Sequence, residues 1–187
     1  SKYRELFLKY YIFQAKWTKL PVIGQLIRMV ANVYGQKASG AYLLTLNEAY
    51  EIVDSSEGVA LGACTCRQIF HNCHHPINTE IMVGLTRNIF MAERPHEYQE
   101  ITRDEAKAIL KQCHQKGLMQ TIIKCRQDFY AICNCCSCCC VPFRLNKKYG
   151  IGYGTDRFKA RGCVKNSSGF RCFIMLKRQD NKVVYRF

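Results

Sequence analysis

Cysteines dominate the chemistry that this sequence can support. Thirteen of the 187 residues are cysteines, and six of them fall in the eight residues from Cys133 to Cys140. Three more stand close together at Cys64, Cys66 and Cys73. Thiolates bind iron–sulfur clusters and thiophilic ions such as Zn²⁺. Six thiols in so short a run cannot all be inert core residues, so the pattern predicts a metal or redox site.

The remaining cysteines are scattered, and each fits the ordinary role of a small buried hydrophobic residue. They are Cys113, Cys125, Cys163 and Cys172. The odd total argues against a closed set of disulfides. No signal peptide is visible in residues 1–13, because no small-residue cleavage site follows their apolar residues. We therefore expect reduced thiols and a cytoplasmic location, either free or peripheral on the inner face of a membrane.

The spacing of the cysteines limits how they can bind a metal. In an extended segment, residues i and i+2 point the same way, so a Cys-x-Cys pair offers two sulfurs to one centre. Adjacent cysteines point apart, so one dense run can supply two centres. The bacterial ferredoxin spacing Cys-x2-Cys-x2-Cys-x3-Cys is absent, and we expect the two cysteine groups to combine. The candidate ligands are Cys64, Cys66, Cys73, Cys133, Cys135, Cys136, Cys138, Cys139 and Cys140.

Two phrases of the sequence resemble a family of prokaryotic 4Fe-4S-binding, ferredoxin-like proteins. The first, CTCR followed by a further cysteine and a proline, spans Cys64–Pro76, and the second, ICNCCSCCC, spans Ile132–Cys140. The resemblance covers roughly residues 45–145 and implies one or two 4Fe-4S clusters and a role in electron transfer. The chain departs from the family in having Glu80 where many members carry a further cysteine, and in lacking their downstream ferredoxin cassette.

Zinc is the alternative metal. The run from Cys133 to Cys140 could supply a four-thiolate site, and a second site could combine three thiols with one histidine. The members of that second set are Cys64, Cys66, Cys73 and one of His71, His74 and His75. Zinc sites usually space their cysteines more widely. The density of the run and the resemblance together therefore favour iron–sulfur chemistry.

Arg67 follows Cys66 directly and is the candidate cofactor-binding residue outside the thiols. An arginine beside an iron–sulfur cluster can donate hydrogen bonds to it and balance its negative charge, which raises the reduction potential. The alternative is an ordinary surface arginine. The sequence has no phosphate loop, no dinucleotide fingerprint and no evident nucleophile with its base. It therefore favours an electron carrier or a subunit of a redox complex over a stand-alone enzyme.

Two similar units are expected to position the cysteines. Each begins with a capping box, Thr45 with Glu48 and Thr102 with Glu105, and continues as an amphipathic helix. Each helix is followed by strand-forming residues and a Cys-x-Cys pair, with an additional hairpin arm in the second unit. The similarity of the two units predicts that both Cys-x-Cys pairs lie at equivalent strand ends. A further helix is predicted within residues 76–91, beginning near residue 78.

The flanking segments complete an α+β organisation. Residues 3–17 and 21–34 are predicted to form a helical pair, with Gly35 at an end. We expect this N-terminal helical pair, a central cysteine-rich α/β domain with short strands, and a small basic β-rich tail. The predicted domains are a basic amphipathic helical segment at 1–43, an iron–sulfur domain at 44–145 and a basic tail at 146–187.

The charge distribution indicates partners of negative charge. The net charge is +14, divided as +6 in residues 1–43, −2 in residues 44–140 and +10 in residues 141–187. Aromatic and basic residues mix in both terminal segments, which suits an acidic redox-partner protein or an anionic membrane surface. For the N-terminal helical pair, the alternative to a membrane surface is packing on the rest of the protein or on a partner subunit. Neither N-terminal helix has the ~20 uninterrupted apolar residues needed to span a bilayer.

A zinc-stabilised nucleic-acid-binding module is the alternative function. The predicted helix over 103–114, followed by two strands, has the outline of a winged helix, and the net charge suits nucleic acid. Aromatic and basic residues between Phe143 and Lys159 would suit a single strand. The middle segment is not basic, however, so the sequence favours the redox function.

Overall fold

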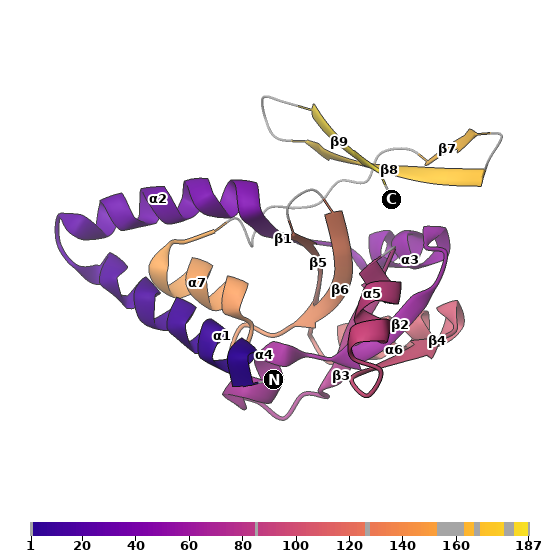
Figure 1. The fold of residues 1–187 in the computed structure, drawn as a ribbon, viewed down its shortest axis with the longest axis horizontal. Helices are drawn as coiled ribbons and strands as arrows, with labels where there is room; N and C mark the ends of the chain where they lie inside the picture. Colours follow the sequence, from indigo (N-terminus) through magenta and orange to yellow (C-terminus); the bar gives the residue numbers. More distant parts are fainter. Residues whose placement is uncertain are drawn as a thin grey trace.

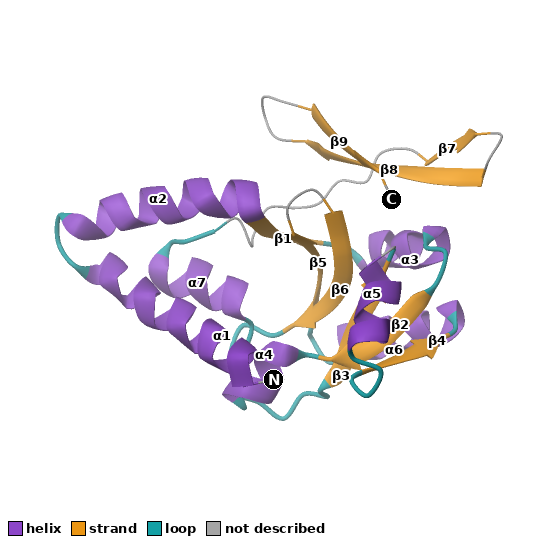
Figure 2. Cartoon of the chain, viewed as in Figure 1, coloured by secondary structure: helices purple, strands orange, loops and turns teal. Residues whose placement is uncertain are grey.

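The computed structural model describes residues 2–84, 86–125, 128–152, 163–166, 169–177 and 182–186. The helices are α1 (Lys2–Ala15), the 3-10 helix η1 (Lys16–Lys19), α2 (Ile23–Ala38), α3 (Leu46–Ser55), α4 (Thr65–Phe70), α5 (Thr86–Glu93), α6 (Arg103–Gln115) and α7 (Val141–Tyr149). The strands are β1 (Ser39–Leu43), β2 (Val59–Ala63), β3 (Asn78–Val83), β4 (Tyr98–Ile101), β5 (Met119–Cys125), β6 (Asp128–Cys135), β7 (Cys163–Asn166), β8 (Gly169–Lys177) and β9 (Lys182–Arg186). Helices and antiparallel strands combine in an α+β fold, which confirms the predicted class (Figure 2).

A six-stranded sheet with the order β1-β5-β6-β3-β2-β4 forms the centre of the protein (Figure 1). Every neighbouring pair in it is antiparallel. Strand β3 pairs with β2 on one side and with β6 on the other, so β2 and β6 run in the same direction. The carboxyl ends of β2 and β6 and the amino end of β3 therefore meet at the same end of the sheet. Both Cys-x-Cys pairs lie there, as the similarity of the two sequence units predicted.

Helices α3 and α6 begin at the two predicted capping boxes, Thr45–Glu48 and Thr102–Glu105. In each box the threonine hydroxyl accepts from the glutamate amide, and the glutamate carboxylate accepts from the threonine amide. The apolar faces of both helices pack on one face of the sheet around Ile81, Ile122 and Ile132, which are fully buried. This core holds in place the strands whose ends carry the cysteines.

The prediction that a helix begins near residue 78 is wrong. Residues Asn78–Val83 form strand β3, and α5 begins only at Thr86. Residues 81–83 are fully buried because β3 lies inside the sheet, between β2 and β6. A short apolar run of this kind has no periodicity that separates a buried strand from a buried helix. Gly84 follows β3 with a φ of +70°, a conformation that other residues seldom adopt.

The N-terminal helical pair is confirmed and forms a hairpin of α1 and α2, with η1 and Val22 at its bend (Figure 1). Gly35 does not end α2, which continues to Ala38 and leads directly into β1. Many large apolar side chains of the hairpin are exposed. They are Tyr3, Leu6, Phe7, Tyr10, Phe13, Trp17, Leu20, Val22, Ile23, Leu26, Met29, Val30, Val33 and Tyr34.

Helix α7 follows the cysteine run directly and was not expected from the sequence. Cys140 is its N-cap, Pro142 lies in its first turn and Gly150 ends it in the left-handed conformation. These are ordinary signals of a helix start and end. Helix α7 packs against the hairpin, where the Gly152 amide donates to Asn32 Oδ1 at 2.7 Å.

Strands β7, β8 and β9 confirm the short strands predicted for the tail. They form a three-stranded antiparallel sheet in the order β7-β8-β9. Most of the mixed aromatic and basic segment between α7 and β7, at residues 153–162, lies outside the described residues. The division of the chain at residues 43 and 145 stays a prediction.

Candidate metal centre

The sheet topology gathers the predicted cysteine ligands at one end of the molecule. Cys64 follows β2 directly and is the N-cap of α4, which contains Cys66. Cys73 lies in the loop between α4 and β3. The second run begins in β6 and continues through a turn into the start of α7. The two cysteine groups of the sequence therefore meet, as their spacing predicted.

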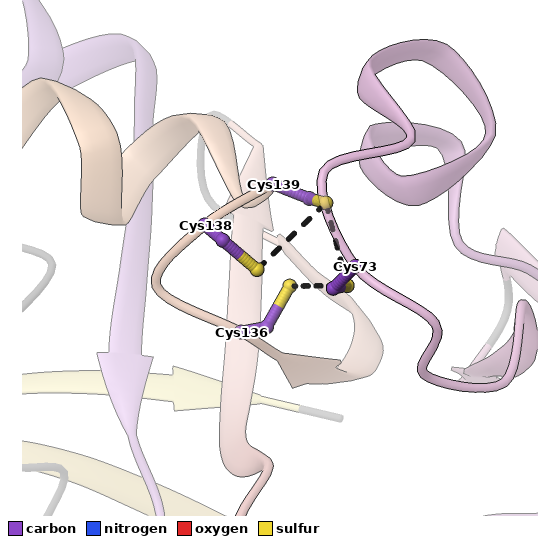
Figure 3. Close-up of side chains that lie close together, drawn as sticks. All are labelled: Cys73, Cys136, Cys138 and Cys139. Carbon is purple, nitrogen blue, oxygen red and sulfur yellow. Dashed lines mark hydrogen bonds between the residues drawn. The ribbon is translucent and has the colours of Figure 1, made fainter.

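Four thiols from these segments converge on one point (Figure 3). The Sγ atoms of Cys73, Cys136, Cys138 and Cys139, called the Cys73 group below, all lie within 4.8 Å of one another. The Cys73 sulfur is 3.7 Å from that of Cys136 and 3.5 Å from that of Cys139. The sulfurs of Cys138 and Cys139 are 3.9 Å apart. Sulfurs bound tetrahedrally to one ion by bonds of about 2.3 Å would be about 3.8 Å apart. The group could therefore hold a metal ion.

Adjacent cysteines of the run turn to different neighbours. Cys136 packs with Cys139, whereas Cys135 packs with Cys140. The sulfurs of Cys135 and Cys140 are 3.4 Å apart, and the Thr121 hydroxyl lies 3.1 Å from the Cys135 sulfur. Cys66 is hydrogen-bonded to Cys140, and Cys133 to Cys135. The thiols of this second set, called the Cys135 group below, are Cys66, Cys133, Cys135 and Cys140.

Hydrogen bonding favours the thiolate form of at least one cysteine in each group, and in the Cys135 group it also lowers the pKa of Cys66 through its bond with Cys140. Bonds from Cys133, Cys140 and the Thr121 hydroxyl hold the pKa of the Cys135 thiol well below its ordinary value. Burial alone would raise the pKa of Cys136, but bonds from the Cys139 amide and from neighbouring thiols lower it to about 7. The thiolate is the form that binds a metal. Each group thus contains a ligand that loses its proton readily.

Arg67 is buried beside both groups, which excludes the surface-arginine alternative. Only 2% of its surface is exposed. Its guanidinium donates to the Asn134 carbonyl oxygen at 2.8 Å and to the Thr79 hydroxyl. Arg67 takes part in none of the ion pairs with carboxylates found among the described residues. Burial alone would lower its pKa, but the sulfurs of Cys64 and Cys136 raise it. A buried cation needs nearby negative charge, and the sulfurs of Cys64, Cys135 and Cys136 are the neighbours that favour the charged form of Arg67.

Cys64 belongs to neither group, although it lies near both Cys66 and Cys135. Its sulfur accepts a hydrogen bond from the Arg67 amide, yet burial raises the pKa of the thiol to about 12. Its predicted role as a ligand is therefore the one for which the geometry gives least support, and it stays a prediction.

Glu80 lies across the sheet from Cys133, because Ile81 pairs with Ile132 in the adjoining position. The Cys133 thiol donates to Glu80 Oε1 at 3.7 Å. Glu80 Oε2 is buried and accepts no hydrogen bond from any residue in the described part of the chain. Burial raises the pKa of Glu80 to about 7. A buried carboxylate oxygen without a donor is costly unless a proton or a cation satisfies it.

The remaining candidates are placed as follows. Among the described residues, the Cys73 group contains none of His71, His74 and His75 and neither Cys64 nor Cys66. The predicted set of three thiols and one histidine is therefore not gathered around Cys73. Cys113 is buried, with 1% of its surface exposed, as expected for a core residue. The side chains of Cys125, Cys163 and Cys172 lie outside the described part of the structure.

Asn134 supports the site without offering a ligand. It alternates with Cys133 and Cys135 in β6, so its side chain takes the opposite face of the strand. Its amide donates to the Thr79 carbonyl oxygen at 2.8 Å and accepts from Gln120 at 3.0 Å. Neither Asn134 nor Thr121 was predicted to be part of the site. The position of Asn134 between two cysteines of a strand was the signal that could have identified it.

Comparisons of the chain with protein-family models, with curated protein sequences and with solved structures found no match. The fold and the site define a cysteine-rich α+β protein with a group of four thiols that could bind a metal.

Proposed function

We propose that this chain is an iron–sulfur protein that transfers electrons through one or two clusters held by its cysteines. The observation that carries the proposal is the meeting of two thiol groups at the Cys135–Cys136 peptide, beside the buried cation of Arg67. A structural zinc site needs four ligands. This chain gathers eight thiols in two neighbouring groups, which is more than one structural ion explains.

Within this proposal the protein residues supply binding and electrostatics. A bound cluster would provide reversible one-electron chemistry. The Arg67 guanidinium stabilises thiolate charge and any further negative charge at the site, which raises the reduction potential. Leu118 packs against the Cys73 group and Phe143 against the Cys135 group, and both limit access of water. The resemblance to 4Fe-4S-binding proteins agrees with this chemistry and stays a prediction.

Zinc is the second candidate, because the sulfur spacing of the Cys73 group favours a single ion. Its measured separations of 3.5, 3.7 and 3.9 Å fit one tetrahedral centre. A 4Fe-4S cluster binds each thiolate through a different iron, so its ligands stand further apart. The Cys73 group would have to widen to hold such a cluster.

The structure contains the helix and the two strands of the winged-helix alternative, but the hairpin that would be its wing is not free. Helix α6 and strands β5 and β6 follow one another as predicted. Strand β5 also pairs with β1, and β6 also pairs with β3, so the hairpin lies in the middle of the sheet. An element that binds nucleic acid must be free to enter a groove or follow a strand. Nucleic-acid binding is therefore supported by the basic charge and by the mixed aromatic and basic residues that follow Phe143, and not by the hairpin.

The partner that we propose for the α1–α2 hairpin is an anionic membrane surface. Val22, at the bend, is 91% exposed among the other exposed apolar side chains of the hairpin. Lys19, Arg28 and Lys148 line an open pocket of about 560 Å³ between the bend and the end of α7. Basic residues beside exposed apolar ones suit lipid phosphates above acyl chains. No helix in the described part of the chain combines the length and apolar character required to cross a membrane.

An acidic redox-partner protein would use the same basic residues, and vesicle binding separates the two partners. A membrane-binding hairpin should sediment with anionic vesicles in the absence of any other protein. A chain that remains in the supernatant with those vesicles would contradict the membrane partner and leave the acidic protein as the candidate.

Metal and sulfide analysis tests the function. The chain is purified without oxygen, and its iron, zinc and acid-labile sulfide are measured together with its visible spectrum before and after dithionite. We expect iron and sulfide in near-equal amounts and a broad brown absorbance that bleaches and returns on reoxidation. Zinc without sulfide in a colourless protein would overturn the electron-transfer function in favour of a zinc-stabilised protein.

A further inference from the structure

We propose that the Cys135 group forms a second metal centre, separate from that of the Cys73 group, with Glu80 as its carboxylate ligand. The proposal rests on the proposed function only in requiring that the thiols bind metal. It assigns to each centre its own share of the cysteine run, which the sequence spacing leaves open.

The contacts of the Cys135 group form a continuous series. Cys66 contacts Cys140, Cys140 contacts Cys135 at 3.4 Å, and Cys135 contacts Cys133. Cys133 then contacts Glu80 at 3.7 Å. The two ends of the series come from α4 and β3, and its middle comes from the second cysteine run. Three separate segments thus supply donors to this series. Unlike those of the Cys73 group, its donor atoms do not all lie within 4.8 Å of one another, so a bound metal would have to draw them together.

Glu80 Oε2 gives independent support for an ion at this place. Two arginines lie near enough to influence Glu80, namely Arg4 and Arg94. Arg4 instead donates to the Thr65 hydroxyl and to Glu97, and Arg94 stacks on Phe90. Glu80 Oε2 remains buried without a hydrogen bond from the described residues. A metal ion bound by the neighbouring thiolates would satisfy this oxygen.

The donor set determines the class of metal. Thiolates select thiophilic metals such as Zn²⁺ or iron over Ca²⁺ and Mg²⁺, which prefer oxygen ligands throughout. One carboxylate beside thiolates is compatible with both zinc and iron. Each thiol that binds loses its proton to solvent, so loading this centre releases protons. Arg67 lies beside Cys135 and offsets part of the resulting negative charge.

Matched variants of the full chain separate the two centres. The pair Cys73→Ser with Cys138→Ser removes ligands from the first centre, and Cys66→Ser with Cys140→Ser removes ligands from the second. Cys113→Ser is the control, because this thiol is buried next to Cys136 but belongs to neither group. Metal content per folded chain is measured after anaerobic purification, with circular dichroism to confirm the fold. We expect each pair variant to keep one of two centres and the control to keep both.

Glu80→Gln is a milder test that leaves every thiol in place. We expect it to keep the Cys73 centre and to release metal from the second centre at roughly tenfold lower chelator concentration, or lower still. Retention of all metal by Cys66→Ser with Cys140→Ser would overturn the second centre. Wild-type chelator resistance in Glu80→Gln would overturn the role of the carboxylate. Equal metal loss in Cys113→Ser would attribute all losses to packing and overturn the division.

The outcomes for the two proposals are distinguishable. Two zinc ions per chain with no reversible bleaching would contradict the electron-transfer function and support the second centre. One reversibly reducible centre, unaffected by loss of Cys66 and Cys140, would support electron transfer and contradict the second centre.

Discussion

Replacing Arg67 with methionine should destabilise the metal-loaded protein more than the metal-free protein. Methionine approximates the volume of the arginine but carries no charge. The guanidinium contacts Asn134 and Thr79 and lies beside the sulfurs of Cys64 and Cys136. Metal binding would deprotonate the sulfurs that act as ligands. In the metal-free protein the thiols whose pKa is raised recover their protons, whereas Cys135 and Cys136 lose theirs readily. Arg67 then faces fewer thiolates, chiefly those of Cys135 and Cys136, so its removal costs less than in the loaded protein.

The expected magnitude follows from the burial of Arg67. Removing one partner of a buried charge pair costs about 3–5 kcal/mol, whereas replacing the charges by apolar atoms is often neutral. For a chain of this length, 1 kcal/mol corresponds to ~2–4 °C in Tm. We therefore expect the Tm of the loaded protein to fall by roughly 6–20 °C. The difference between the losses of stability in the two forms equals the loss of metal affinity, about tenfold for each ~1.4 kcal/mol.

The change in Tm is measured by thermal unfolding followed by circular dichroism, with and without chelator under anaerobic conditions. The change in metal affinity is measured by competition with a chelator. Arg103→Met is the control for loss of an arginine away from the thiols. Arg103 is exposed and donates to the Ser56 carbonyl oxygen at 2.7 Å, near the opposite end of β2 from the cysteines. We expect its small effect to be the same in both forms. An equal loss of stability by Arg67→Met in the loaded and metal-free proteins would refute the argument, because Arg67 would then act through packing alone.

Three further predictions concern the fold and the membrane. Leu110→Ala, in the fully buried face of α6, should lower the free energy of unfolding by about 2–5 kcal/mol in urea denaturation; a loss below 1 kcal/mol would contradict its place in the core. Hydrogen bonding to Thr102 lowers the pKa of Glu105, so its stabilising contribution is present above the ordinary carboxyl pKa and is lost as the pH falls through the lowered value. The stability gap between the wild type and Glu105→Gln should therefore close in acid, and a gap that persists there would exclude the charge as its source. Lys19→Gln should weaken binding to anionic vesicles by roughly fivefold, since each basic residue near such a surface contributes about 1 kcal/mol; unchanged sedimentation would place Lys19 away from the lipid.

The features predicted correctly were those fixed by neighbouring residues. The capping boxes at Thr45 and Thr102 depend on side chains three residues apart, so the sequence contains the whole interaction. The alternation of strand residues likewise predicted that Cys133 and Cys135 share a side of β6. The convergence of the two cysteine groups was predicted from the hypothesis of a shared metal site, whose ligands must meet whatever the intervening fold.

Features that depend on distant residues were missed. Residues 78–83 form strand β3 because β2 and β6 pair with them. The apolar residues of this segment do not by themselves indicate either partner strand. Because this segment was predicted to be a helix, the sequence did not predict that Glu80 would lie opposite Cys133 in a sheet. The burial of Arg67 has the same origin, because its hydrogen-bond partners Thr79 and Asn134 come from two different strands.

The positions in the run that are not cysteine explain its spacing. Asn134 takes the face of β6 opposite to Cys133 and Cys135, where it is buried and hydrogen-bonded. Ser137 is exposed in the turn that follows β6. The Cys140 amide donates to the Cys136 carbonyl oxygen at 3.2 Å and closes this turn, which returns the chain towards Cys135. The strand and the turn therefore divide one run between two sides, and a cysteine at either remaining position would face neither group. A single ion would require no such division, whereas two centres require a run that changes direction between them.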